Sequence, residues 1–329
     1  MTGNIVSFDI GSAQIKLVWC AGGVCKAAVS APVPDGLVRG GTIVSMDAMA
    51  DLLRQLAKEN NLPRSAQAAV ILPAPLVFTR ITELPPMTEG QLTYNLPFEF
   101  KDYLTQEKSR YYFDYAVQEL VRGEDDSVTR MKLFACATLK TTIEDYRSMM
   151  NRAGFKLKLA LPEEAAYAAL LTDCIRRTQP ESRDYCLVDV GHAGIRMFIL
   201  RDDRFITRRT IDLGMLDLIR SISERQGVDE HIALAHMLSN YEGAMTDPAS
   251  MDLYHRMAAE ITKAVNFYNR QQALRRVYLC GGGAAVGHIG DAIREVADLE
   301  VLPAADLMPD TGSDAPWLYT RALGCALQA

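Results

Sequence analysis

The sequence lacks any run of about 18 consecutive apolar residues, the length that a membrane-spanning helix requires. Near its start it lacks a basic segment followed by an apolar one, because Ile5 and Val6 lead directly to Asp9, and we expect no signal peptide. It also lacks a surplus of basic residues: 35 Lys and Arg stand against 41 Asp and Glu, with a formal net charge of -6. We therefore expect a cytoplasmic protein with no direct membrane insertion and no nucleic-acid partner.

Cysteine pairs with redox or metal-ligand spacing are lacking as well. The seven cysteines are scattered along the chain and no two of them form a Cys-x-x-Cys pair. The five histidines show no metal-ligand spacing with the cysteines. We expect the cysteines to be small buried side chains in a reducing compartment.

What is present is ordinary globular composition with an internal repeat. The chain has 329 residues, of which 49% are hydrophobic and 23% charged, enough for two domains of about 150 residues each. The apolar pattern predicts a three-stranded unit that occurs twice. Its strands are expected at residues 4–10, 14–20 and 24–31, and again at 185–190, 195–200 and 205–212. A polar stretch that contains proline, residues 176–184, separates the two copies.

Residues 81–154 depart from this repeat. A helix should begin near Thr88 and be kinked by Pro97, and two strands should follow it. A second helix is expected to open with a capping box at Thr141–Glu144 and to end at Gly154. The stretch is therefore predicted to be an inserted subdomain. In the second half, a long helix should run from Asp247-Pro248 to near Gln272.

Three glycine-bearing segments follow predicted strands. They read Asp9-Ile-Gly11-Ser-Ala-Gln-Ile-Lys16, Asp189-Val-Gly191-His-Ala-Gly194 and Cys280-Gly281-Gly282-Gly283. Glycine lets backbone N–H groups approach a phosphate, and a strand-end aspartate suits a hydrated Mg²⁺. Lys16 can offer a point charge to a β- or γ-phosphate, and the triple glycine can lie flat against an adenine and lead into a helix N-terminus.

Each segment alone is more often an ordinary turn, a solvated strand lysine or the start of a helix. Their occurrence in this order predicts an ATP site with Mg²⁺. No P-loop pattern is present, and no Gly-x-Gly-x-x-Gly follows the first strand. P-loop and dinucleotide-binding chemistry are therefore disfavoured.

These segments resemble the superfamily of actin, hexokinase and the DnaK-type chaperones. Within it, the chain resembles the PilM family of actin-like type IV pilus assembly proteins, which is related to the division protein FtsA. Three further stretches carry the closer likeness: LPPMTEGQL at 84–92, LKTTIEDYRSMMNRAGFKLKLALPEEAAYAAL at 139–170, and NFYNRQQALRRVYLCGGGAAVGHIGDAI at 266–293. The resemblance extends over essentially the whole chain.

The resemblance implies an α/β fold of the actin-like, ribonuclease H-like kind, with two domains, four subdomains and an FtsA-like inserted subdomain. The expected parts are the first core half (1A) at 1–80 and 155–178, the insert (1C-like) at 81–154, the second core half (2A) at 184–220 and 277–329, and a helical subdomain (2B) at 221–276.

The resemblance also assigns site residues, by position, for ATP and Mg²⁺. The implied catalytic residues are Asp9, Asp189 and Glu163 or Glu164, with the register between the two glutamates left open. The implied metal residues are Asp9 and Asp189, and the implied nucleotide-binding residues are Gly11, Ser12, Lys16, Gly191, Gly214, Gly282 and Gly283.

Three departures from the family pattern bear on catalysis. They are His192 and Ile195 in the second loop, Gly214-Met215 where paired glycines are usual, and Ala235-His236-Met-Leu-Ser239 where the ribose segment Ala-Glu-x-x-Lys is usual. Losing a carboxylate and a lysine at the ribose removes charge-assisted bonds worth about 1.5–3 kcal/mol each. We expect weak nucleotide binding and at most a slow ATPase.

The family further implies a partner, the N-terminal cytoplasmic peptide of a PilN-like inner-membrane protein, together with pilus motor and platform components and self-association. The protein would then be peripheral to the inner face of the cytoplasmic membrane through that partner. The peptide groove lies beside the insert, where Phe98, Phe100 and the stretch Tyr111–Tyr115 are candidates to line it. The alternative is that these rings form the insert's own core.

Other functions stay open at this point. One is a degenerate adaptor that has kept the fold and binds no nucleotide. Another is a small-molecule kinase of the same superfamily, although no convincing catalytic aspartate stands beyond Asp9 and Asp189. The division protein itself is disfavoured, because residues 317–329 contain one arginine and no basic amphipathic face.

Overall fold

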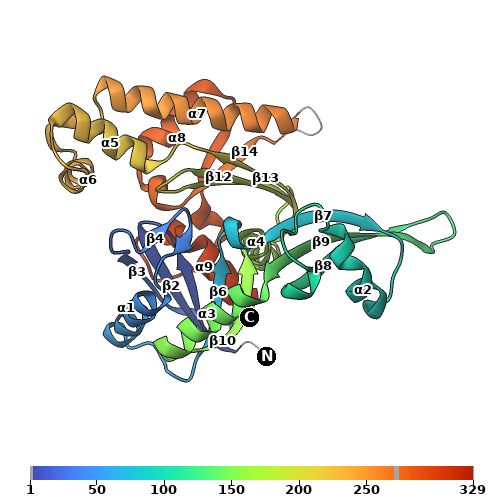
Figure 1. Cartoon of the computed structure of the whole chain (residues 1–329). Helices are drawn as coiled ribbons and strands as arrows, with labels where there is room; N and C mark the ends of the chain where they lie inside the picture. Colours follow the sequence, from blue (N-terminus) through green and yellow to red (C-terminus); the bar gives the residue numbers. More distant parts are fainter. Residues whose placement is uncertain (1–2, 270–273, 329) are drawn as a thin grey trace. The chain divides into compact units, whose positions relative to one another are not determined.

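The computed structural model describes residues 3–269 and 274–328 (Figure 1). The expected end of the long helix near Gln272 lies outside these residues. The chain divides into two compact units, unit 1 with residues 1–169 and 321–329, and unit 2 with residues 170–320. None of the helices in the described part is long and apolar enough to span a membrane.

Unit 1 is built on a five-stranded sheet. Its strands, in order across the sheet, are β10 (Lys156–Pro162), β6 (Gln67–Leu72), β1 (Asn4–Ile10), β2 (Gln14–Ala21) and β3 (Val24–Pro32). The strand β1 lies at the centre, parallel to β6 and antiparallel to β2. Its residues are buried from Ile5 to Asp9, including the polar Ser7 and Asp9, because the strand is covered on both faces. A small hairpin, β4 (Val38–Arg39) with β5 (Thr42–Ile43), follows β3.

Two helices, α1 (Met46–Glu59) and α3 (Lys140–Ala153), pack together and share one core with this sheet. Arg152 of α3 joins them at the surface, with ion pairs to Asp47 and Asp51 of α1. Gly154 ends α3 in the left-handed conformation (φ 95°), as predicted. The predicted capping box at Thr141 is wrong: Leu139, the last residue of the preceding strand, is the N-cap and makes no side-chain cap bond.

The insert forms a second sheet within unit 1. Its strands, in order across the sheet, are β7 (Phe78–Leu84), β9 (Val128–Leu139) and β8 (Tyr111–Arg122), all antiparallel. The helix α2 (Glu89–Glu99) begins as predicted, with Thr88 and Gln91 forming a reciprocal capping box. Pro97 lies in the last turn of this helix. Leu96 and Phe100 pack onto the sheet with Ala135 and Ala137 of β9, which gives the insert its own apolar core.

Unit 2 repeats the sheet of unit 1. Its strands, in order across the sheet, are β13 (Arg204–Ile211), β12 (Ile195–Arg201), β11 (Asp184–Val190), β14 (Arg276–Cys280) and β15 (Glu300–Pro303). As in unit 1, three consecutive strands are antiparallel, and the first of them also pairs in parallel with a later strand. The predicted repeat of the three-stranded unit is therefore confirmed.

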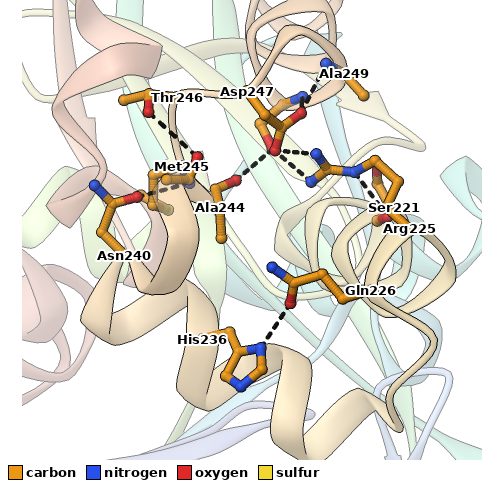
Figure 2. Close-up of polar contacts among 12 residues, drawn as sticks. Ser221, Arg225, Gln226, His236, Asn240, Ala244, Met245, Thr246, Asp247 and Ala249 are labelled. Atoms are coloured by element: carbon orange, nitrogen blue, oxygen red, sulfur yellow. Dashed lines mark hydrogen bonds and ion pairs between the residues drawn. The ribbon is translucent and has the colours of Figure 1, made fainter.

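Helices cover one face of this second sheet (Figure 1). They are α5 (Met215–Gln226), α7 (Pro248–Asn269) and α8 (Gly287–Val296), and α6 (Glu230–Ser239) packs against α5. Figure 2 shows how α7 is anchored: Asp247 accepts hydrogen bonds from the N–H groups of Ala249 and Ser250 at the helix start. Arg225 of α5 pairs with the same carboxylate, so one partly exposed network fixes the start of α7 against α5.

Two further helices contain the points where the units divide. They are α4 (Glu163–Thr178), which begins in unit 1, and α9 (Thr320–Gln328), which lies in unit 1 from Arg321 onward. The side chains of Ala322, Leu323 and Cys325 in α9 are buried. The backbone of this helix is also fixed to the central strand, because the hydroxyl of Ser7 in β1 donates a hydrogen bond to the carbonyl of Ala322 at 2.5 Å.

Candidate functional site

The first glycine turn joins β1 to β2 in unit 1. The N–H of Gly11 donates to the carbonyl of Gln14 at 2.9 Å, and a Cβ at Gly11 would lie 2.9 Å from that oxygen, so only glycine fits. Asp9 stands opposite Lys16 in the register of the two strands, and both are buried. The Lys16 ammonium lies 3.5 Å from where that Cβ would be, which places its charge over the turn. Ser12 is partly exposed in the turn.

Two adjacent glutamates begin α4, and they have different partners. Glu163 Oε1 lies 2.9 Å from Nη1 of Arg321, whose Nη2 lies 3.1 Å from Asp9 Oδ2. Glu164 instead accepts a hydrogen bond of 2.9 Å from the hydroxyl of Thr79 in β7. The structure therefore places Glu163, and not Glu164, in one ion-pair cluster with Asp9.

Arg321 was missed by reasoning from the sequence. It comes from α9, at the other end of the chain from Asp9, and its side chain is only 8% exposed. The one available signal was a single arginine in an otherwise apolar C-terminal helix. A buried arginine requires a partner of opposite charge, but nothing in the sequence says which carboxylate that is.

The second glycine turn joins β11 to β12 in unit 2 and copies the first. The N–H of Gly191 donates to the carbonyl of Gly194 at 3.0 Å. Asp189 is buried and stands opposite Arg196 in the register, as Asp9 stands opposite Lys16. Arg196 Nη2 lies 3.3 Å from Asp189 Oδ2. Arg196 was also missed, although it follows Asp189 by the same seven residues that separate Lys16 from Asp9.

The triple glycine of unit 2 packs directly against this second turn. Gly281 has a positive φ of 82°, and a Cβ there would lie 2.2 Å from Asp189 Oδ1. A Cβ at Gly283 would lie 2.2 Å from Cγ1 of Val190. A Cβ at Gly282, by contrast, would meet no atom within 4 Å. Two of these glycines are therefore required by packing, whereas the third faces open space.

Gly214 brings the N-terminus of α5 to the same place. A Cβ at Gly214 would lie 2.5 Å from the backbone nitrogen of Gly194, so this contact also requires glycine. The N–H groups of Met215 and Leu216 donate to the carbonyls of Gly191 and His192, at 3.1 and 2.8 Å. The second loop, Gly214 and the triple glycine, which are far apart in the sequence, thus form one cluster in unit 2.

The departures from the family pattern have structural consequences. Burial lowers the pKa of His192 below its usual value, with nearby Glu230 opposing the shift. At the ribose segment, the His236 ring lies 2.6 Å from Gln226 Oε1 (Figure 2). Ser239 donates to the carbonyl of Ala235 in its own helix. The side chains that stand in place of the ribose glutamate and lysine are therefore engaged within unit 2.

The carboxylates of the two turns do not fit a Mg²⁺ ion held by the protein. Mg²⁺ takes carboxylate and water oxygens, but Asp9 and Glu163 share the guanidinium of Arg321, and Asp189 pairs with Arg196. Within residues 3–269 and 274–328, no group of three or more His, Cys, Asp or Glu side chains is arranged to hold a metal ion. The buried negative charges are compensated by arginine.

The aromatic residues of the insert divide between core and surface. Phe100 and Tyr111 are buried in the insert, as the core alternative expected. Phe98 and Tyr112 are exposed, with Lys108 Nζ 4.4 Å from the centroid of the Phe98 ring. Tyr94 is also exposed and lies beside Phe98. The insert therefore has an apolar core and, separately, exposed aromatic rings on α2 and β8.

The two units contain sheets of the same strand order, and each sheet carries an Asp-x-Gly hairpin. Together with the inserted α/β subdomain, this arrangement defines an actin-like protein. The sequence matches the family described as "Type IV pilus assembly protein PilM" over residues 7–307. The chain belongs to that family, and it is therefore an actin-like protein of type IV pilus assembly. The predictions of family and fold are both confirmed.

Solved structures agree with this fold. The structure described as "PilM-PilN type IV pilus biogenesis complex" is 19% identical, with a TM-score of 0.78, and the match covers 100% of this chain and 99% of that chain. The ethanolamine utilization protein EutJ from Carboxydothermus hydrogenoformans gives 17% identity and a TM-score of 0.62 over 98% and 88% of the two chains. MreB 5 of Spiroplasma citri bound to AMPPNP gives 12% and 0.53 over 98% and 95%. A search of curated protein sequences finds no match.

Proposed function

We propose that this chain is an ATP-binding scaffold of type IV pilus assembly, which recruits the N-terminal cytoplasmic peptide of a PilN-like protein and is thereby held at the inner face of the cytoplasmic membrane. The observation that carries the nucleotide part is the glycine cluster of unit 2. There Gly191, Gly214, Gly281 and Gly283 lie at distances from their neighbours that allow no side chain, and Gly282 beside them faces open space. Such turns let backbone N–H groups come close to phosphates and rings.

Nucleotide binding is further supported by the two matching hairpins. Each has a buried aspartate opposite a basic residue, Lys16 in unit 1 and Arg196 in unit 2. MreB 5, which shares the fold, is described as bound to AMPPNP. Fold likeness alone does not carry function to this chain, so the proposal rests on the cations and glycines at the turns.

Turnover is proposed to be slow or absent. An ATPase of this kind needs a carboxylate that orients the attacking water, and Glu163 is the residue that lies in the cluster with Asp9. Its Oε1, however, accepts a hydrogen bond from Arg321, which favours a structural role in this state. The nucleotide would then serve mainly to hold the scaffold in shape.

The partner proposal rests on the surface of the insert. Phe98 is exposed on α2, with Tyr94 and Lys108 beside it. Exposed rings next to a cation suit a short peptide that offers apolar and acidic side chains. The structure described as a PilM–PilN complex supports a partner of the PilN kind.

The nucleotide proposal is tested by Gly282→Val, with Gly287→Val as its control. Cβ atoms at both glycines meet no atom within 4 Å, so neither change should disturb the fold. Only Gly282 belongs to the wall where an adenine would lie. We expect Gly282→Val to weaken ATP binding, measured by calorimetry, by about tenfold or more, with Gly287→Val unchanged. Equal affinities for both variants would contradict the placement of the nucleotide.

The partner proposal is tested by Phe98→Ser, with Leu238→Ser on α6 as its control. Leu238 is 76% exposed and Phe98 48% exposed, so both changes replace a surface apolar side chain. An aromatic anchor in a protein interface is typically worth about 2 kcal/mol or more. We expect Phe98→Ser alone to abolish capture of a PilN-like N-terminal peptide. Capture that both variants retain would overturn the assigned surface.

A second candidate is an adaptor that binds no nucleotide, and one observation favours it. His236 and Ser239 bond to Gln226 and Ala235 within unit 2, where the family pattern would offer a carboxylate and a lysine to ribose. The same titration separates the two. Peptide capture by a wild-type chain that binds no ATP at millimolar concentration would establish the adaptor.

A further inference from the structure

The starting observation is a buried cluster of three charges in unit 1. Arg321 contacts Asp9 and Glu163 at 3.1 and 2.9 Å, and all three side chains are at most 8% exposed. Charged side chains at this depth are tolerated only when they are paired and hydrogen-bonded. Arg321 is therefore the cation that the two carboxylates share.

The carboxylates of this first turn already have cations beside them. Arg321 contacts Asp9 and Glu163, and the buried Lys16 stands opposite Asp9 in the strand register. A dication placed between the same carboxylates would stand next to a guanidinium that already occupies that position. Two like charges at contact distance in a buried site repel each other strongly.

In the second turn the aspartate is paired within its own hairpin. Asp189 is paired with Arg196 of the neighbouring strand, at 3.3 Å. Each turn thus has an arginine beside its aspartate, where a metal-dependent site would need a carboxylate that faces the ion. The arginine beside the aspartate comes from α9 in unit 1 and from β12 in unit 2.

We propose that arginine stands in this chain where Mg²⁺ would otherwise meet the carboxylates of the turns, so that ATP binding has no requirement for a divalent cation. The inference rests on the proposed nucleotide function and specifies the chemistry of that same site. Ammonium groups can bind phosphate oxygens directly, and the Lys16 ammonium lies over the first glycine turn. The aspartates orient these cations and do not ligate a metal.

The first arm of the test is ATP binding by the full chain, measured by calorimetry in excess Mg²⁺ and again in excess EDTA. We expect Kd values that agree within about threefold, or about 0.7 kcal/mol. Weakening by tenfold or more in EDTA would overturn the proposal. Absence of binding in both buffers would instead refute the nucleotide function, and the second arm then decides the metal question alone.

The second arm uses Mn²⁺ without nucleotide, followed by electron paramagnetic resonance. Wild type and Arg321→Lys, which keeps a positive charge, should bind no Mn²⁺ at millimolar concentration. Arg321→Met should bind it, because Asp9 and Glu163 lose their counter-charge, and the double variant Arg321→Met/Glu163→Gln should lose it again. Mn²⁺ binding by wild type would overturn the proposal even if Arg321→Met fails to fold.

Discussion

The two hairpins of this protein have the same backbone conformation, but their aspartates are paired with different cations. In unit 2, Asp189 is paired with Arg196, which lies seven residues away on the next strand. In unit 1, the residue opposite Asp9 is Lys16, whose ammonium lies over the glycine turn. There Asp9 is paired with Arg321, from the far end of the chain. The two hairpins thus share their backbone conformation, although their aspartates pair with different arginines.

This difference has a consequence for the C-terminal helix. Because Arg321 contacts Asp9 and Glu163, α9 is tied to the first turn by charge as well as by apolar burial. The second turn needs no such helix. Its aspartate is instead covered by Gly281, at which even a Cβ would overlap the carboxylate. The partner of Asp9 thus comes from far along the chain, whereas the partner of Asp189 comes from the neighbouring strand.

The largest expected difference between the turns concerns their arginines. Arg321→Met leaves two buried carboxylates without their counter-charge and should lower the free energy of unfolding by about 3–5 kcal/mol. Arg196→Met should cost less, about 1–3 kcal/mol, because that side chain is 27% exposed and water can replace it. Chemical denaturation followed by circular dichroism measures both.

A surface pair provides the control for this measurement. Arg130→Met breaks an exposed ion pair with Glu83 and should change stability by about 0–1 kcal/mol. An Arg321→Met variant no less stable than Arg130→Met would show that the buried cluster contributes little.

The glycines of the turns should behave alike, since the backbone geometry is shared. A Cβ at Gly11 or at Gly191 would lie 2.9 or 2.8 Å from a carbonyl oxygen of its own turn. Gly11→Ala and Gly191→Ala should each destabilise by about 1–3 kcal/mol through this overlap. Gly90→Ala, in α2 with no atom within 4 Å, should instead be neutral or stabilise by up to about 1 kcal/mol. Thermal unfolding measures both losses of stability. Clearly different losses for Gly11→Ala and Gly191→Ala would show that the two turns are not equivalent.

The smallest effect should come from the residue after each glycine, Ser12 in the first turn and His192 in the second. Burial lowers the pKa of His192 in the folded protein, whereas in the unfolded chain a histidine has a pKa of about 6.5. As the pH falls below that value, the unfolded state takes up a proton before the folded state does, so stability decreases. His192→Ser should remove this part of the decrease. Denaturation midpoints on both sides of that pH measure it, and identical pH profiles for wild type and variant would count against it.

Much of the fold could be predicted from the sequence because its signals are local. The strands of both repeats, the hairpin that pairs Asp9 with Lys16, and the Thr88 cap of α2 all depend on residues close in the chain. The strand β7 was not predicted, because its burial is set by β9, far along the sequence. The Thr141 cap was wrongly predicted because β9 continues directly into α3 and leaves no residue between them for a side-chain cap.

The candidate site divides in the same way. Gly191 and Gly281 were recognisable from strand-turn patterns, and the structure brings their segments together in unit 2. The pairing of Glu163 with Arg321 was not, because 158 residues separate them and only the folded chain selects this partner. The roles of these residues toward nucleotide remain predictions, which rest on charge and space at the turns.

One titration decides whether ATP binding by this protein requires a divalent cation. Calorimetry of ATP with the full wild-type chain in excess EDTA should give the affinity that is found in excess Mg²⁺, because Arg321 and Arg196 already compensate the carboxylates of both turns. Binding that appears only when Mg²⁺ is added would show that a divalent cation enters the site, and would contradict the account.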